Sequence, residues 1–127
     1  MKIILKLKID LKKNLDLSEL SKLNNCNITI KKIKSLKFLY GTNLINIEKV
    51  FSIKLTKTKL EFNDFVIEGS SPFFNYLGFN WIHDNLVIHG DVGSYLGQSM
   101  KSGKIFVNGN CRDFVGSEMI GGLIKIK

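Results

Sequence analysis

The sequence predicts a mainly β protein, a single-stranded solenoid of the parallel β-helix type behind a small irregular α+β cap, and three observations support this fold class. Residues 86–104 and 105–123 are one 19-residue unit written twice. Four of the nineteen positions are identical, and all four are glycine or methionine. Residues 65–85 fit the same template less closely. A repeat that keeps its turn residues and apolar positions while its polar residues vary specifies backbone shape, as stacked repeats do.

Each unit has the same order of apolar residues, glycines and a methionine. It opens with an apolar run, continues through an aromatic residue, an aliphatic residue and a glycine, and closes with methionine and glycine. The first unit has two extra residues after Gly69 and Trp81 in the methionine position. Glycines at corners supply positive φ angles where a side chain would clash. The predicted structural motif comprises Gly69, Gly78, Gly90, Gly93, Gly97, Met100, Gly103, Gly109, Gly116, Met119, Gly121 and Gly122.

The length of the unit decides between repeat architectures. Helical repeats need about 33 residues or more, and a regular Leu/Asn pattern typical of leucine-rich repeats is absent. A unit of about 19 residues holds two or three short strands with glycine turns, which is one coil of a parallel β-helix. Strand alternation predicts inward side chains that stack between units at Leu86, Ile88, Ile105 and Val107. It predicts outward side chains at Val87, His89, Phe106 and Asn108.

The front of the chain predicts a cap over residues 1–62, packed as one unit with coils over residues 63–127, because no Pro/Gly/Ser-rich linker separates the two. Residues 16–20 predict a short helix capped by Asp16 or Ser18, and residues 28–36 predict a second helix. Residues 40–43 form a turn between the apolar runs 37–39 and 44–47, which indicates a hairpin. Residues 48–51 predict one further turn of helix.

Charge is unevenly distributed along the 127 residues, a length that fits one domain. The net charge is +8; residues 1–60 hold 14 Lys against 4 acids, and residues 61–127 hold 5 basic residues against 7 acids. A basic half raises the question of nucleic acid. However, Arg112 is the only arginine, and arginine is the residue suited to bidentate phosphate and base contacts. We therefore expect no nucleic-acid partner, and no membrane partner because no apolar run approaches the length of a span.

The two cysteines, Cys26 and Cys111, predict neither a disulfide framework nor a zinc site. They form no CxxC motif, and no histidine lies within ligand spacing of either. Cys111 occupies the position of Val92 in the preceding unit, which predicts a buried, inert side chain. Residues 3–11 alternate strictly and lack the continuous apolar run of a secretion signal. A reduced, cytoplasmic location is expected.

Catalytic motifs do not assemble from these residues. Residues 97–104 have five rather than four residues between their glycines, and Lys104 is followed by isoleucine, so a phosphate-binding loop is not predicted. His83 and His89 are expected to be surface histidines. The acidic residues of the repeats occur singly, without the paired spacing of acid/base catalysis: Glu68, Asp84, Asp91, Asp113 and Glu118. We therefore predict no catalytic, cofactor-binding or metal-binding residue in this chain.

Specific residues nevertheless resemble a known family. Gly90-Asp91-Val92-Gly93, followed by Gly97, Met100 and Gly103 and by the same motif in the next unit, is similar to the GXGXG domain family. Within it the likeness is to the C-type subunit of formylmethanofuran dehydrogenase and of the formyltransferase/hydrolase complex, and residues 15–20 and 41–51 resemble the front of those proteins. The C-terminal domain of glutamate synthase carries a similar coil. Two positions depart from the pattern: Arg112 replaces the glycine equivalent to Gly93, and Ser102 replaces the first glycine of the Gly121-Gly122 pair.

The resemblance implies a right-handed parallel β-helix that serves as a non-catalytic scaffold within an enzyme complex. The first expectation is the structural, C-type subunit of a formyltransferase/hydrolase complex in one-carbon metabolism linked to tetrahydromethanopterin and methanofuran. The alternatives are the C-type subunit of a molybdenum or tungsten formylmethanofuran dehydrogenase, and a stand-alone β-helix interaction module. The chain itself is expected to bind no cofactor; a molybdenum or tungsten pterin would belong to a partner subunit of the dehydrogenase. The expected partners are the other subunits of either complex.

The last residues begin another unit, since 124–127 alternate as an opening strand does. We therefore expect the edge of this strand to be open and to be completed by further coils of a longer protein or by another chain.

Overall fold

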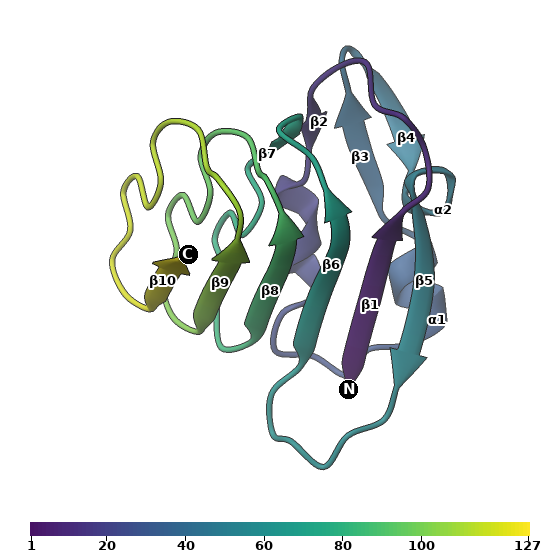
Figure 1. The fold of residues 1–127 in the computed structure, drawn as a ribbon. Coiled ribbons are helices and arrows are strands. Elements are labelled where there is room, and N and C mark those ends of the chain that lie inside the picture. Colours follow the sequence, from purple (N-terminus) through teal and green to yellow (C-terminus); the bar gives the residue numbers. More distant parts are fainter.

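The computed structural model describes residues 1–127 and contains two sheets and three short helices (Figure 1). The larger sheet has six strands in the order β10-β9-β8-β6-β1-β5, formed by Leu123–Ile126, Lys104–Asn108, Asn85–Gly90, Asp64–Ser70, Lys2–Leu7 and Phe51–Thr56. The smaller sheet has four strands in the order β4-β3-β2-β7, formed by Asn43–Asn46, Lys37–Tyr40, Leu15–Asp16 and Phe74–Asn75. The helices are the 3₁₀ helix η1 and the α-helices α1 and α2, formed by Ser18–Leu23, Ile30–Lys34 and Ile47–Val50.

The predicted fold class, a mainly β right-handed parallel β-helix of 19-residue coils, was wrong. Both sheets are mixed: β1 pairs in parallel with β6 but antiparallel with β5, while β2 pairs antiparallel with β3 and in parallel with β7. The strands do not close into a solenoid, and the molecule is a small α/β fold. The 19-residue repeat accounts for the parallel strands of its own residues and does not extend to the strands of the front half. The alternating strand β1 lies between β6 and the edge strand β5, so the front of the chain and the repeats share one sheet.

The register between the repeats agrees with the predicted stacking of inward side chains. β8 and β9 pair in parallel, with Leu86 opposite Ile105 and Ile88 opposite Val107, and all four side chains are buried. β6 lies on the other side of β8, and β10 extends the same parallel order beyond β9. The outward residues Val87 and Phe106 are half-buried, and His89 and Asn108 are exposed. A common spacing therefore sets which side chains meet across these strands.

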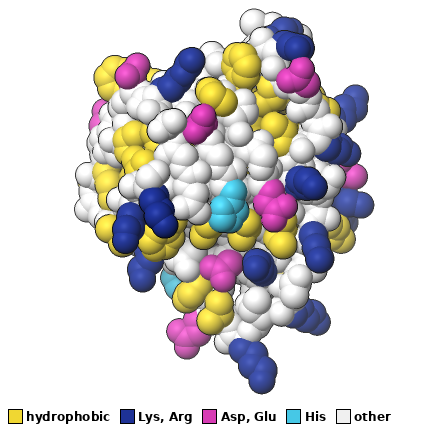
Figure 2. Space-filling model, in the orientation of Figure 1, with side chains coloured by type: hydrophobic (Ala, Val, Ile, Leu, Met, Phe, Trp, Pro, Cys, Tyr) yellow, Lys and Arg dark blue, Asp and Glu magenta, His cyan; other side chains and the backbone are white.

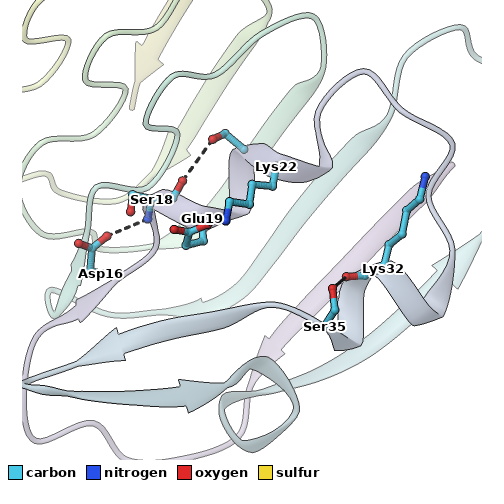
Figure 3. Close-up of polar contacts among 7 residues, drawn as sticks. Asp16, Ser18, Glu19, Lys22, Lys32 and Ser35 are labelled. Atoms are coloured by element: carbon cyan, nitrogen blue, oxygen red, sulfur yellow. Dashed lines mark hydrogen bonds and ion pairs between the residues drawn. The ribbon is translucent and has the colours of Figure 1, made fainter.

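The local elements of the front half lie close to their predicted positions. β3 and β4 form the hairpin around residues 40–43, and α1 lies within the predicted range 28–36, with the Thr29 hydroxyl accepting from Lys32 N–H at 3.2 Å. The helix expected over 16–20 is the 3₁₀ helix η1, and Asp16 Oδ1 accepts from Ser18 N–H at 2.9 Å before its first turn (Figure 3). α2 begins one residue earlier than predicted. None of these helices has the length and apolar composition needed to cross a bilayer.

One hydrophobic core joins the front half to the repeats. It contains 26 buried residues drawn from both halves of the chain. Edge-to-face aromatic contacts strengthen this core: Phe51 of the front half packs on Phe74 of the first unit with ring centroids 5.7 Å apart, and within that unit Phe65 packs on Trp81 at 5.1 Å. Trp81 is fully buried in the position that methionine takes in the later units. Such pairs add about 0.5–1.5 kcal/mol each to the burial of their rings.

Candidate interaction surface

Exposed apolar side chains concentrate at one end of the larger sheet. Half of the ten exposed large hydrophobic residues of the chain lie within residues 114–126, with exposed fractions between 37% and 78%. Figure 2 shows hydrophobic side chains along the left side, where Figure 1 places β9 and β10. A contiguous exposed apolar patch marks an interaction site more often than scattered single residues do. We call this surface the β10 face; it comprises Phe114, Val115, Ile120, Leu123 and Ile126.

The β10 face is exposed because it ends columns of side chains that are buried in the earlier units. Leu77 and Leu96 are each 1% exposed, whereas Val115, the next member of their column, is 37% exposed. Met100 is fully buried and Met119 is only partly buried. The predicted stacking of the two methionines therefore leaves the second one at the boundary of the core. Each column lacks the neighbour that would cover its last member.

An aromatic ladder runs across the repeats to the same face. Tyr76 and Tyr95 stack with ring centroids 4.8 Å apart and planes within 4° of parallel, and Tyr95 and Phe114 stack at 4.9 Å and 14°. All three residues have positive φ, between 58° and 63°. Non-glycine residues in this region carry strain of order 1 kcal/mol or more. The stacked rings help to offset it, and the outer ring, Phe114, ends the ladder with 61% of its surface exposed.

Two glycines of the motif, Gly93 and Gly121, are replaced by other residues in a neighbouring unit, and the structure shows why each is glycine. A Cβ on Gly93 would lie 2.2 Å from Oδ1 of Asn75, which accepts the N–H of Ser94 at 2.8 Å. The same Cβ would lie 2.6 and 2.8 Å from the carbonyl oxygens of Pro72 and Phe74, so Gly93 must be glycine. The residue one unit later than Asn75 is Ser94, whose side chain is shorter, but the structure offers no full explanation for Arg112 at the position equivalent to Gly93. Gly121 also has no room for a side chain, because its Cβ would lie 2.3 Å from the carbonyl oxygen of Lys101.

Asp84 is the polar residue that sequence reasoning missed. Its side chain is fully buried. Oδ1 accepts the backbone N–H of Asn63 at 3.0 Å, and Oδ2 accepts the backbone N–H of Asn25 at 2.8 Å and the side-chain amides of Asn24 and Asn63 at 3.2 and 3.4 Å. These donors lie 21 to 60 residues away in the chain. The asparagines at 24, 25 and 63 were the only signal, and no local pattern connects them to an aspartate.

A hollow of about 610 Å³ opens beside Asp84 on the side of the N-terminal residue. His83 lies at its rim, exposed, with Nε2 3.3 Å from the carbonyl oxygen of Glu61. Most of the residues that line the hollow are polar. Both carboxylate oxygens of Asp84 already accept N–H groups of the protein. The carboxylate therefore joins the front half to the repeats.

The other predicted surface residues have structural partners. His89 is exposed, as predicted, and its Nδ1 lies 3.2 Å from the side-chain amide of Asn108. Asp91 Oδ1 accepts the N–H of Asn110 at 2.8 Å, which links the same corner of consecutive units. No three residues among the histidines, cysteines, aspartates and glutamates are arranged to hold a metal ion.

The two thiols differ in their surroundings. Cys111 is half-buried rather than fully buried, contrary to the prediction, because it belongs to the last complete unit. Burial raises the pKa of its thiol, and the nearby negative charge of Asp91 raises it further. Cys26 Sγ lies 3.3 Å from the carbonyl oxygen of Leu23. A raised pKa lowers the thiolate fraction of Cys111 and therefore its reactivity.

Comparison with known proteins relates this fold to one chain of an enzyme complex. No protein-family model matches the sequence, and no curated protein matches it. Among solved structures, the chain is similar to a subunit of a multi-subunit complex. That structure is the X-ray crystal structure of the formyltransferase/hydrolase complex (FhcABCD) from Methylorubrum extorquens in complex with methylofuran, with a TM-score of 0.84 and 27% sequence identity.

The similarity extends over 98% of this chain and 45% of the chain from the complex. This chain therefore spans somewhat less than half the length of the chain it matches. The resemblance inferred from the sequence is confirmed as a likeness to a chain of the formyltransferase/hydrolase complex. Membership of the GXGXG family is not shown by these comparisons.

Proposed function

We propose that this chain is a non-catalytic structural subunit, a counterpart of the C-type subunit, in a formyltransferase/hydrolase complex of one-carbon metabolism linked to tetrahydromethanopterin and methanofuran. The observation that carries the proposal is the structural similarity, at 27% identity over nearly the whole chain, to a chain of such a complex. The partners are the other subunits of the complex. The formyl-transferring and hydrolytic sites belong to those subunits.

The roles of the buried and corner carboxylates support a scaffold. Asp84 holds four N–H donors from residues distant in sequence. Asp91 joins two units at a corner, and Asp64 Oδ1 accepts the side-chain amide of Asn85 across β6 and β8 at 3.1 Å. General acid/base chemistry needs a carboxyl group that can reach a substrate. These three carboxylates instead maintain the arrangement of strands.

The β10 face supports docking within an assembly. Exposed apolar residues cost little when scattered, but five within thirteen residues of sequence form a surface that is stabilised by covering it. Obligate interfaces between subunits are apolar in this way. Further residues of a longer chain or a neighbouring subunit would cover it.

Co-expression tests the proposal directly. The chain is produced with the three other subunits of a formyltransferase/hydrolase complex, one of which has an affinity tag, and the purified assembly is analysed by native mass spectrometry. We expect the chain to co-purify in a fixed ratio. We expect the variant Ile120→Asp to weaken its retention, and the matched variant Leu44→Asp, at an exposed residue of β4, to leave retention unchanged.

Activity and metal content complete this test. Formate release from a formyl carrier is expected from the assembly and not from the isolated chain. Release by the isolated chain would overturn the scaffold assignment. Stoichiometric molybdenum or tungsten in the purified assembly would overturn the formyltransferase/hydrolase assignment in favour of the dehydrogenase.

A further inference from the structure

One row of apolar side chains crosses the outward face of the larger sheet. The strand registers set Ile4 beside Val66, Val66 beside Val87, and Val87 beside Phe106, on the strands β1, β6, β8 and β9. All four side chains are half-buried. The row ends at a lysine on each of the two outer strands, β5 and β10, opposite Ile4 and Phe106. We call these four residues the apolar row; both of its ends lie within the six strands of the sheet.

The chain's own elements leave the apolar row uncovered. The helices and the smaller sheet lie behind the larger sheet in Figure 1, on the face that carries the core residues Ile3, Phe65 and Leu86. Figure 2 shows the front, where hydrophobic side chains cross the sheet beside acidic side chains, a histidine and lysines. A sheet with one face on the core and the other in solvent normally places polar residues outward. Four apolar residues in register depart from that pattern, and an apolar surface with a polar rim marks an interaction site.

A hollow of about 370 Å³ lies over the apolar row at β1, β6 and β8. Its floor is formed by Ile4, Val66 and Val87. Its rim is formed by polar side chains of the same three strands: Lys2, Asp64, Glu68 and His89. Valine is shorter than these rim residues, so the hollow has room for a large apolar side chain. An apolar position inside a polar rim is where a single anchoring side chain contributes most to binding.

The charges beside the apolar row change sign from one strand to the next. On β1 the apolar residue of the row is flanked by Lys2 and Lys6, and on β6 it is flanked by Asp64 and Glu68. None of these four residues takes part in any of the three ion pairs of the chain. Complementary charges fix the register of two surfaces, and like charges oppose their contact. A partner that matches the row therefore carries acidic side chains over β1 and basic side chains over β6.

The strands of the apolar row restrict the form of this partner. Each of the four is paired on both sides, so no main-chain groups are free to bind an added strand. The partner must bind through its side chains and satisfy its own backbone, as an α-helix in a groove does. Neighbouring strands lie about 4.8 Å apart, and one helical turn rises about 5.4 Å. A helix along the row thus sets one apolar side chain over each strand. The chain's own helices have six residues or fewer, so a second copy does not supply such a helix.

We propose that the apolar row binds an amphipathic helix of a partner protein, with one apolar residue per turn, acidic residues beside the first and lysine or arginine beside the second. The apolar side chain over Val66 fills the hollow. The acidic side chains contact Lys2 and Lys6, and the basic ones contact Asp64 and Glu68. The inference rests on the proposed function only for the existence of a partner subunit, because the chemistry of the helix follows from the sheet itself.

A peptide titration followed by NMR tests the helix. The probe is an alanine-based helical peptide, blocked at both ends, with one leucine in each of four turns, glutamates beside the first leucine and lysines beside the second. It is added to the chain with ¹³C-labelled isoleucine and valine methyl groups. We expect saturable shifts centred on the methyl groups of Ile4, Val66 and Val87, with a Kd of about 1 mM or lower. The isomeric peptide, in which glutamates and lysines are exchanged, is expected to bind at least about fivefold more weakly.

Variants test the charges and the hollow separately. Lys6→Glu combined with Glu68→Lys keeps the net charge and is expected to bring the affinities of the two peptides within about twofold of each other. The matched control is Lys34→Glu combined with Glu48→Lys, an ion pair that bridges α1 and α2, which is expected to leave both affinities unchanged. Val66→Thr keeps the size and branching of the side chain but adds a hydroxyl group to the hollow. It is expected to weaken binding of the first peptide about threefold or more.

Several results would overturn the inference. These are equal binding of the two peptides to the unaltered chain, shifts centred on the β10 face or the smaller sheet, no saturable shift at millimolar peptide, or self-association through the apolar row in the absence of peptide. Loss of binding in a longer form of the chain would also overturn it, because the added residues would then occupy the row. Failure of the peptide to bind while the chain still co-purifies with the other subunits would remove the helix and leave the proposed function. Binding at the row without co-purification would remove the proposed function and leave the helix.

Discussion

Replacement of the Asp84 carboxylate by an amide, Asp84→Asn, is the sharpest test of how the front half is attached to the repeats. The carboxylate accepts four N–H bonds in a fully buried place. With the amide oxygen in the Oδ2 position, three of these bonds are kept but become neutral, and the new NH₂ group faces the backbone N–H of Asn63. The opposite orientation sets the NH₂ group against three donors. The first orientation is therefore the one that the variant adopts.

The magnitude follows from the bonds that change. Hydrogen bonds to a charged group contribute about 1.5–3 kcal/mol each, and neutral ones about 0.5–1.5 kcal/mol. Three weakened bonds and one buried donor facing another donor cost roughly 4–6 kcal/mol, and relief from burying a charge offsets part of this. The partners cannot easily adapt, because Asn24 Oδ1 already accepts the N–H of Ile82 at 3.2 Å and two of the donors are backbone groups. We expect a net loss of about 2–4 kcal/mol in the free energy of unfolding.

Urea unfolding measured by circular dichroism gives this quantity, and Asp64→Asn is the matched control. Asp64 is half-buried, and its carboxylate accepts a single side-chain amide, so a loss below about 1 kcal/mol is expected. Hydrogen exchange at the amides of Asn25 and Asn63 should accelerate in Asp84→Asn ahead of exchange in β8 and β9. Equal losses in the two variants, or no loss in Asp84→Asn, would refute the role assigned to the buried carboxylate.

Two further predictions concern the repeats. Met100→Ala is expected to lower the free energy of unfolding by about 2–5 kcal/mol, because the side chain is fully buried, whereas His89→Ala at an exposed position should change it by less than about 0.5 kcal/mol; thermal melts that rank the two the other way would contradict the register. Asp91→Asn keeps the acceptor for Asn110 but removes the charge that raises the pKa of the Cys111 thiol. Alkylation of Cys111 by iodoacetamide at a fixed pH below that pKa should therefore become faster, and an unchanged rate would leave burial as the sole cause.

The sequence determined those features whose cause is local or periodic. Spacing of 19 residues placed Leu86 opposite Ile105 because side chains on a parallel strand pair only with residues in the same phase. The hairpin around residues 40–43 and the short helix within residues 28–36 followed from turn and cap residues that act within a few positions. The likeness to a chain of the formyltransferase/hydrolase complex was also present in the sequence, since the glycines and apolar positions that carry it recur at fixed intervals.

Only the tertiary structure decided the fold class and the surroundings of Asp84. Strand β1 alternates as any half-buried strand does, and nothing in its residues states that it pairs in parallel with β6 and antiparallel with β5. The burial of Asp84 depends on donors up to 60 residues away. A local pattern specifies which side of a strand is apolar, because side-chain direction alternates along the backbone. Which strand lies against that side is set by the packing of the whole chain, where many segments of equal local preference compete for the same core.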